Sequence, residues 1–161
     1  MIKLLRIDDR LVHGQVAVSW VSFTGADTLL VANEQAVNDK MMQAAFSMAT
    51  PPQVLLSIKN IEGAILVINN PKHENRNILV ITASIDDALT ICNNTNSIKT
   101  ICLGGIRKAE SKKMIDMQVY LDEHDINNLK KLHELNKEIF LQAVPTGRKL
   151  GYEDIIKEFY K

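Results

Sequence analysis

Short apolar runs alternate with stretches of helical periodicity along the whole chain. The runs, rich in Val, Ile and Leu, predict strands at residues 2–7, 27–32, 54–58, 78–82, 100–104, 118–122 and 138–144. The stretches between them predict helices near residues 15–23, 38–49, 59–69, 86–93, 124–135 and 152–159. This alternation is typical of a parallel sheet that helices cover on both faces. We therefore expect an α/β fold, with an open, mostly parallel β-sheet of about seven strands and helices on both faces.

Local signals place two of the helix boundaries. Pro51 and Pro52 lack backbone N–H donors and keep Thr50 out of the helical conformation, so the second helix must end before them. Ser84 stands three residues before Asp87, which is the spacing of a capping box. We therefore expect the fourth helix to start at Ser84.

The first helix has an ambiguous pattern. Val16, Val18 and Trp20 alternate as they would in a strand, whereas Val16, Trp20 and Phe23 follow helical spacing. We expect a helix because a parallel neighbouring strand follows, and parallel strands need a crossover connection.

Length, charge and cysteine content narrow the class of protein. The 161 residues fit one domain that spans residues 1–161. The 19 basic residues balance the 19 acidic ones, so we expect no nucleic-acid partner. The apolar runs are strand-sized and the N-terminus lacks the features of a signal peptide, which predicts a cytoplasmic protein. Cys92 and Cys102 lie in apolar surroundings and form no CxxC pair, so we expect buried thiols rather than a disulfide or a metal site.

The sequence RIDDRLVHGQV, at the end of the first predicted strand, contains the strongest candidate chemistry. In open parallel sheets, ligands gather at the carboxyl ends of the strands, where helix N-termini attract anions. His13 could attack a phosphorus atom through one ring nitrogen while a hydrogen bond at the other nitrogen fixes the tautomer. Arg6 and Arg10 could neutralise the phosphoryl group with their guanidinium groups. Gly14 and Gln15 could add backbone N–H donors.

The same residues also have a purely structural explanation. A single histidine among charged residues is often a partly exposed side chain with a satisfied hydrogen bond. The arginines and aspartates could simply pair with one another at the surface. Asp8 and Asp9 oppose an anion unless they point away, pair with the arginines or orient the imidazole. We expect a structural role for Asp9, capping the turn that follows it.

A second candidate loop follows the fifth predicted strand. Gly104 and Gly105, followed by two basic residues, could cradle a phosphate, although tight turns also use paired glycines routinely. Neither a GxxxxGK[ST] nor a GxGxxG pattern occurs, and no histidines or cysteines have the spacing of metal ligands. We expect no metal and no other cofactor, and we interpret Ser84 as a helix cap rather than a ligand.

The stretch IDDRLVHGQVAVSW closely resembles the start of the IIB subunits of the mannose/fructose/sorbose class of the bacterial sugar phosphotransferase system. The resemblance spans essentially the whole chain and includes PPQV at 51–54, NNPK at 69–72, GG at 104–105 and VP at 144–145. It implies that Nδ1 of His13 receives a phosphoryl group from a phosphohistidine of a IIA partner. It also implies transfer of this group to a sugar during uptake through the membrane subunits IIC and IID, peripheral association with the inner face of the membrane through them, and chemistry without a metal or nucleotide.

Other functions remain open at this point. A regulatory module that uses the same His13 chemistry, without sugar transport, would have the same motif. A stand-alone phosphotransferase or phosphatase would need its own acid or base, and no second histidine is evident near the site. The resemblance identifies the sugar only as mannose, fructose, sorbose or an amino sugar. Leu11 and Val12 could either help to dock a partner or pack in the core.

Overall fold

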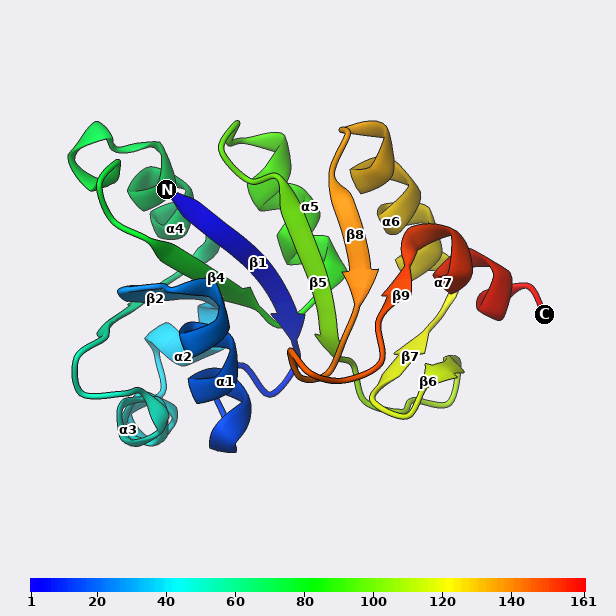
Figure 1. Ribbon diagram of the computed structural model, residues 1–161, viewed down its shortest axis with the longest axis horizontal. Helices are drawn as coiled ribbons and strands as arrows, with labels where there is room; N and C mark the ends of the chain where they lie inside the picture. Colours follow the sequence, from blue (N-terminus) through cyan, green and yellow to red (C-terminus); the bar gives the residue numbers. More distant parts are fainter.

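A sheet of seven strands forms the centre of the structure, a computed structural model that describes residues 1–161 (Figure 1). Its order is β3-β2-β4-β1-β5-β8-β9, and each neighbouring pair is parallel except β8 and β9. The strands are β1 (Ile2–Asp8), β2 (Thr28–Ala32), β3 (Leu55–Lys59), β4 (Ile78–Thr82), β5 (Thr100–Gly105), β8 (Glu138–Leu141) and β9 (Leu150–Gly151). β1 lies between β4 and β5, so its carboxyl end has a strand on each side.

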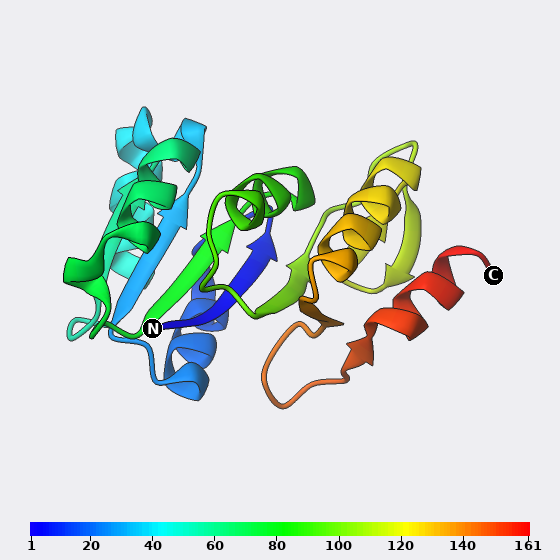
Figure 2. The same cartoon turned by 90° about the horizontal axis from the view of Figure 1, so that it is seen from above.

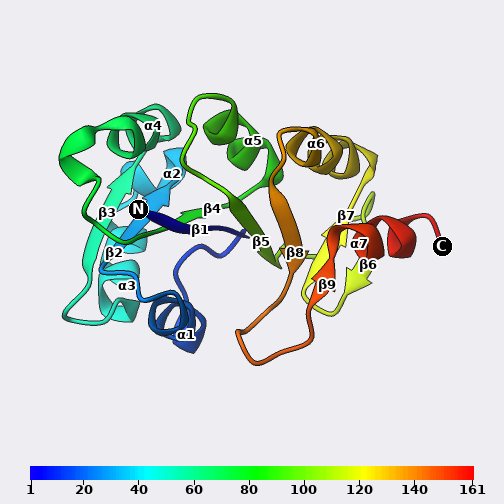
Figure 3. The same ribbon diagram turned by 45° about the horizontal axis from the view of Figure 1, so that its top comes forward.

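Helices cover both faces of this sheet, which confirms the predicted fold class. They are α1 (Gly14–Thr24), α2 (Glu34–Val37), α3 (Lys40–Ala49), α4 (Ile61–Asn69), α5 (Ile85–Asn93), α6 (Glu123–Glu134) and α7 (Tyr152–Phe159), with a 3-10 turn η1 at Pro71–His73. Figure 3 shows α4, α5 and α6 along one face and α1 and α3 along the other. No helix is both long enough and apolar enough to cross a lipid bilayer.

Alternate strand residues face two separate hydrophobic cores. In β1, Leu4 belongs to the core that contains Trp20 of α1, whereas Leu5 belongs to the core that contains Ile91 of α5. Successive side chains of a strand point to opposite faces. Arg6 therefore falls on the same face as Leu4, which is the buried face of the strand beneath α1.

The structure corrects the predicted strands at two places. The strand expected at 118–122 is β7 (Val119–Leu121), which pairs antiparallel with β6 (Lys113–Asp116) in a separate ribbon. Figure 2 shows this ribbon and α7 together at one end of the molecule. The strand expected at 138–144 ends at Leu141, and the seventh place in the sheet belongs to β9, whose two residues are too few to show a period.

The helix predictions agree more closely with the structure. The ambiguous segment at 15–23 is helical, as α1. α3 ends at Ala49, and Thr50 is extended in front of the two prolines. The short helix α2, capped by the side chain of Asn33, was not predicted.

The connections after β1 and β4 leave the sheet on opposite faces. β1 leads into α1, which packs on the Trp20 side, and β4 leads into α5, which packs on the Ile91 side. In open α/β sheets, neighbouring strands with such divergent connections mark the crevice in which ligands bind. His13 stands in the β1–α1 connection and therefore lies beside this point.

Candidate active site

The β1–α1 connection is a tight turn that is held by Asp8. The amide of Leu11 donates to the carbonyl oxygen of Asp8 at 2.9 Å, and the amide of Arg10 donates to Oδ1 of Asp8 at 3.0 Å. Leu11 adopts a φ of 60°, in the left-handed region that few side chains occupy, and is nevertheless buried. The turn brings the chain back over the end of β1, and His13 follows as the N-cap residue of α1.

The imidazole of His13 contacts the carboxylate of Asp8. Nε2 of His13 lies 2.8 Å from Oδ2 of Asp8, and the two side chains are 20% and 2% exposed. Because an ionised carboxylate can only accept, Nε2 must carry the hydrogen of this bond. A neutral ring then has its lone pair on Nδ1. The geometry therefore leaves Nδ1 as the ring nitrogen of His13 that is free to act as a nucleophile.

Arg6 lies beneath this pair rather than in front of it. Its side chain is 3% exposed, and its guanidinium donates to the carbonyl oxygens of Gln142 at 3.0 Å and Ala143 at 2.8 Å. Its NH2 atom also lies 3.7 Å from Oδ2 of Asp8. Backbone carbonyls occupy the fork of this guanidinium, so Arg6 does not present it to a phosphate as the sequence suggests.

The paired glycines make room for these two charged side chains. A Cβ atom on Gly104 would lie 2.2 Å from Cζ of Arg6, and one on Gly105 would lie 3.2 Å from Oδ1 of Asp8. Both residues are buried. Their lack of side chains is thus explained by the packing of Arg6 and Asp8, and no phosphate cradle is needed to account for it.

Arg10, Gly14 and Gln15 are the predicted phosphate-binding residues that reach the surface. All three are exposed, and the side chain of Arg10 makes no hydrogen bond or ion pair within the chain. Gly14 and Gln15 form the start of α1, where backbone N–H groups have no helical carbonyl to bind. The side chain of His13 makes no capping bond to them. These donors and the positive end of the α1 dipole are therefore available next to His13.

Ser84 has the capping contact that the sequence predicts. Asp9 does not cap the turn that follows it, because Asp8 holds that turn, and Asp9 makes a structural contact of another kind. Oδ2 of Asp9 accepts from the backbone N–H of Arg107 at 2.8 Å and from its Nε at 3.2 Å. The amide of Asp9 donates to the carbonyl oxygen of Gly105 at 2.9 Å. Asp9 thus ties the β1–α1 connection to the loop after β5. The hydroxyl of Ser84 accepts from the amide of Asp87 at 3.1 Å and caps α5.

The cysteines and the apolar residues near His13 contribute little to the chemistry of the site. Burial raises the pKa of the Cys92 and Cys102 thiols to about 11, so both are protonated near neutral pH. Leu11 and Val12 are 4% exposed and pack in the core under α1, which leaves them little surface for docking. No group of three or more His, Cys, Asp or Glu side chains is arranged to hold a metal ion.

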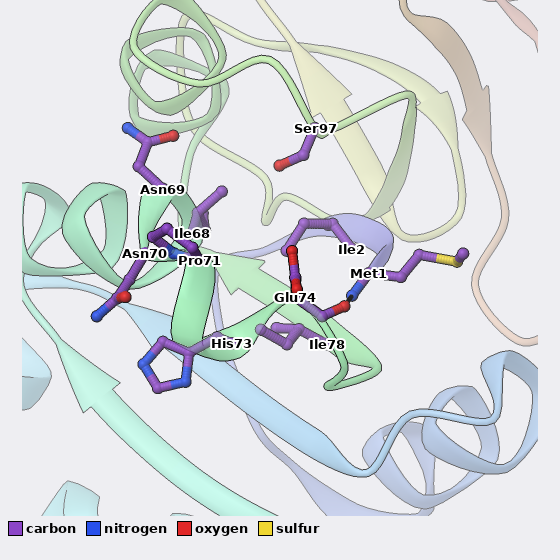
Figure 4. Close-up of a pocket in the computed structure, with 10 residues that line it drawn as sticks. All are labelled: Met1, Ile2, Ile68, Asn69, Asn70, Pro71, His73, Glu74, Ile78 and Ser97. Carbon is purple, nitrogen blue, oxygen red and sulfur yellow. Dashed lines mark hydrogen bonds between the residues drawn. The ribbon is translucent and has the colours of Figure 1, made fainter.

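The hollow shown in Figure 4 lies at the amino-terminal ends of the strands, opposite to the end where His13 is found. It has a volume of about 200 Å³ and is lined by residues such as Ile2 and Ile78, which begin β1 and β4. His13 follows the other end of β1. A strand of this length spans about 20 Å, so this hollow takes no part in the chemistry of His13.

The sequence pattern does not single out Asp8 as the partner of the histidine. It leaves an orienting role open for both aspartates and favours a structural role for Asp9. The alternation within β1 contained the missing signal, because Leu4, Arg6 and Asp8 share one face of the strand. A buried acidic residue next to a buried arginine on that face points to a paired, functional carboxylate.

Comparison with known proteins agrees with the resemblance seen in the sequence. Residues 2–161 match the family described as "PTS system sorbose subfamily IIB component", where PTS denotes the phosphotransferase system. The sorbose-specific EIIB component of Klebsiella pneumoniae is 29% identical over 157 residues, which cover 98% of this chain and 96% of that protein. The mannose-specific EIIAB component of Escherichia coli (strain K12) is 29% identical over 161 residues, and the chain spans 50% of its length.

A solved structure supports the same assignment. The crystal structure of the IIBSor domain of the sorbose permease from Klebsiella pneumoniae matches with a TM-score of 0.92 and 29% identity, covering 98% of this chain and 97% of that one. The fold match and the family match both cover essentially the whole chain. The chain belongs to the sorbose subfamily of the IIB components of the sugar phosphotransferase system.

Proposed function

We propose that the protein is a phosphoryl carrier of a sugar uptake system. Nδ1 of His13 accepts a phosphoryl group from a phosphohistidine of a IIA protein and passes it to a sugar that enters through membrane subunits IIC and IID. The contact between Asp8 and His13 carries this proposal, because it leaves Nδ1 as the free ring nitrogen. The name of the mannose-specific relative joins IIA and IIB in one protein, of which this chain matches half, and this supports IIA as the donor.

The first transfer exchanges one P–N bond for another. The lone pair of His13 Nδ1 forms a bond to phosphorus while the P–N bond of the donor breaks, and the donor imidazole leaves with the electron pair. The ring of His13 then carries a positive charge, and its Nε2–H points at the carboxylate of Asp8. An ionised carboxylate at this distance stabilises the charge that develops on the ring, and it also fixes the tautomer.

The second transfer ends with the phosphoryl group on oxygen. A sugar hydroxyl oxygen attacks phosphorus, the P–Nδ1 bond breaks, the electron pair returns to the ring, and the hydroxyl proton is released. Catalysis of such a step depends mainly on alignment and on neutralising charge. Arg10 and the first amides of α1, from Gly14 and Gln15, hold the phosphoryl oxygens in this scheme.

Phosphorylation of the purified protein by a phosphorylated IIA protein tests the proposal. We expect one acid-labile phosphoryl group on the wild type by mass spectrometry and none on His13→Ala. His73→Ala is the matched control, since His73 lies in the 3-10 turn before β4, at the other edge of the sheet, and should be labelled like the wild type. Label retained by His13→Ala would refute the assignment.

A second assay separates transport from regulation. Membranes that contain IIC and IID should convert added sugar to sugar phosphate when they receive the phosphorylated protein. Loss of label from His13 together with formation of sugar phosphate is the result expected of a carrier. A phosphorylated protein that keeps its label in the presence of each sugar of the class would instead support a regulatory module.

A further inference from the structure

We propose that Arg6 is a positioning residue that joins the Asp8–His13 pair to the segment 142–149, so that one buried guanidinium holds both the catalytic carboxylate and this segment in place. The part of this proposal that concerns the transfer rate rests on the proposed function. The segment connects β8 to β9. Its first residues contact β1 and β5, because Arg6 donates to Gln142 and Ala143 and the amide of Gln142 donates to the carbonyl oxygen of Leu103.

The guanidinium of Arg6 makes contacts to three separate parts of the chain. It donates to Gln142 and Ala143 in the segment 142–149, it donates to Sγ of Cys102 in β5 at 3.3 Å, and it faces Asp8 at 3.7 Å. Asp8 is the only carboxylate within 4.0 Å of it. A buried cation is stable only when it is paired and hydrogen-bonded. Arg6 therefore depends on both Asp8 and the carbonyls, and it fixes their positions in return.

Trp20 of α1 completes the same cluster. Its ring lies under the guanidinium of Arg6, with Cζ at 4.9 Å from the ring centroid, and its Nε1 donates to the carbonyl oxygen of Ala143 at 3.0 Å. This carbonyl thus accepts from both Arg6 and Trp20. Because α1 begins directly after His13, the cluster also connects the helix that presents the histidine to the segment 142–149.

The rest of the segment is held mainly by its own contacts. Nε2 of Gln142 donates to the carbonyl oxygens of Pro145 at 3.1 Å and Gly147 at 2.9 Å. At its farther end, the exposed Arg148 forms an ion pair of 3.7 Å with the partly exposed Asp116, and Nζ of the exposed Lys149 lies 4.2 Å from the centroid of the Phe140 ring. Exposed pairs of this kind contribute little. The contacts of Arg6 and Trp20 are thus the buried side-chain anchors of the segment, close to the acceptor histidine.

Gly104→Ala provides a test that does not remove Arg6. The new Cβ would lie 2.2 Å from Cζ of Arg6, so the guanidinium must move. Gly151→Ala is the matched control, because a Cβ at Gly151 meets nothing within 4 Å. Arg6→Lys is the second variant, which keeps the charge near Asp8 but loses the planar fork that reaches two carbonyls.

Two measurements follow each variant. The first is kcat and KM for phosphoryl transfer from phosphorylated IIA, normalised to folded protein by circular dichroism. The second, on unphosphorylated protein, is hydrogen exchange of the amides in 142–149, together with acrylamide quenching of Trp20, which is the single tryptophan and is 1% exposed. We expect Gly104→Ala to lower kcat about tenfold to a hundredfold, as when a residue that orients a catalytic group is lost.

KM for phosphorylated IIA should stay at the wild-type value, while exchange in 142–149 and quenching of Trp20 rise. Arg6→Lys should loosen the segment as much but lose less kcat. If Gly104→Ala lowers the thermal stability but leaves kcat and the exchange of 142–149 at wild-type values, the proposal is wrong. If Gly104→Ala does not fold, the same result for Arg6→Lys would overturn the proposal. If wild-type protein is not labelled on His13, the proposed function fails, and the exchange and quenching results still decide whether Arg6 anchors the segment.

Discussion

Replacing Asp8 with asparagine tests the central feature of the site. The new side-chain amide would keep an oxygen that can accept from Nε2 of His13, so the tautomer and the shape of the contact are preserved while the negative charge is lost. In the wild type this charge faces the ring nitrogen at 2.8 Å from a position that is 2% exposed. A group this well shielded from water interacts strongly with the positive charge that develops on the ring.

The expected loss follows from the energy of that contact. A hydrogen bond to a charged group contributes about 1.5–3 kcal/mol. Each 1.36 kcal/mol changes a rate tenfold, so phosphoryl transfer to Asp8→Asn should be roughly 10- to 150-fold slower. Because Asp8 also faces the buried Arg6, the variant should be less stable than the wild type. The rate must therefore be expressed per folded molecule.

The assay is the initial rate of labelling by phosphorylated IIA, measured by rapid quench and acid-free separation, with thermal unfolding followed in parallel. Asp86→Asn is a suitable control, because Asp86 also contacts a histidine, His124, at 2.8 Å, but both side chains are more than half exposed. This control should label at the wild-type rate. If Asp8→Asn also labels at the wild-type rate per folded molecule, the carboxylate does not stabilise the ring charge and the reasoning is wrong.

Three further predictions concern the surroundings of the site. Arg10→Lys should slow phosphoryl transfer by more than it lowers the melting temperature, since lysine keeps the charge without the fork; equal kinetics in a labelling assay would make Arg10 a plain surface charge. Ser84→Ala should lower the free energy of unfolding by about 1 kcal/mol in urea titrations, because α5 loses its cap, and an unchanged midpoint would contradict this. Cys92 and Cys102 should resist iodoacetamide at pH 8 in the folded protein and react on unfolding, because burial raises the pKa of both thiols to about 11. Rapid alkylation of the native protein would contradict this burial. Because the unfolded thiols lose their protons at a lower pH than the folded ones, the folded state should also lose stability as the pH rises from the ordinary thiol pKa through 11.

Much of the scaffold follows from local sequence signals. The apolar runs mark β1 to β5 within a residue or two, since a buried parallel strand is apolar on both faces. Pro51 and Ser84 place helix ends because a missing N–H donor and a capping hydroxyl act on neighbouring residues. The position of His13 after β1 follows in the same way, because strand and helix boundaries on both sides of the loop are local features.

The partners of these elements depend on contacts that no local pattern contains. Residues 119–121 have the composition of a strand, yet their hydrogen bonds go to β6, and two residues of β9 complete the sheet through pairing with β8. Arg6 looked like a phosphate ligand because charge in a sequence is usually exposed. Only the folded chain shows that its carbonyl acceptors come from Gln142 and Ala143, which lie 136 and 137 positions further along the sequence.

The sequence by itself determined the α/β class, the family motif and the placement of His13 at the carboxyl end of β1. The tertiary structure decided which ring nitrogen is free, which aspartate holds the imidazole, and why Gly104 and Gly105 lack side chains. The physical reason is the range of the forces involved. Periodicity and capping act within a few residues, whereas desolvation of a charge forces it to find partners wherever the fold brings them, as Arg6 finds Asp8, Gln142 and Ala143.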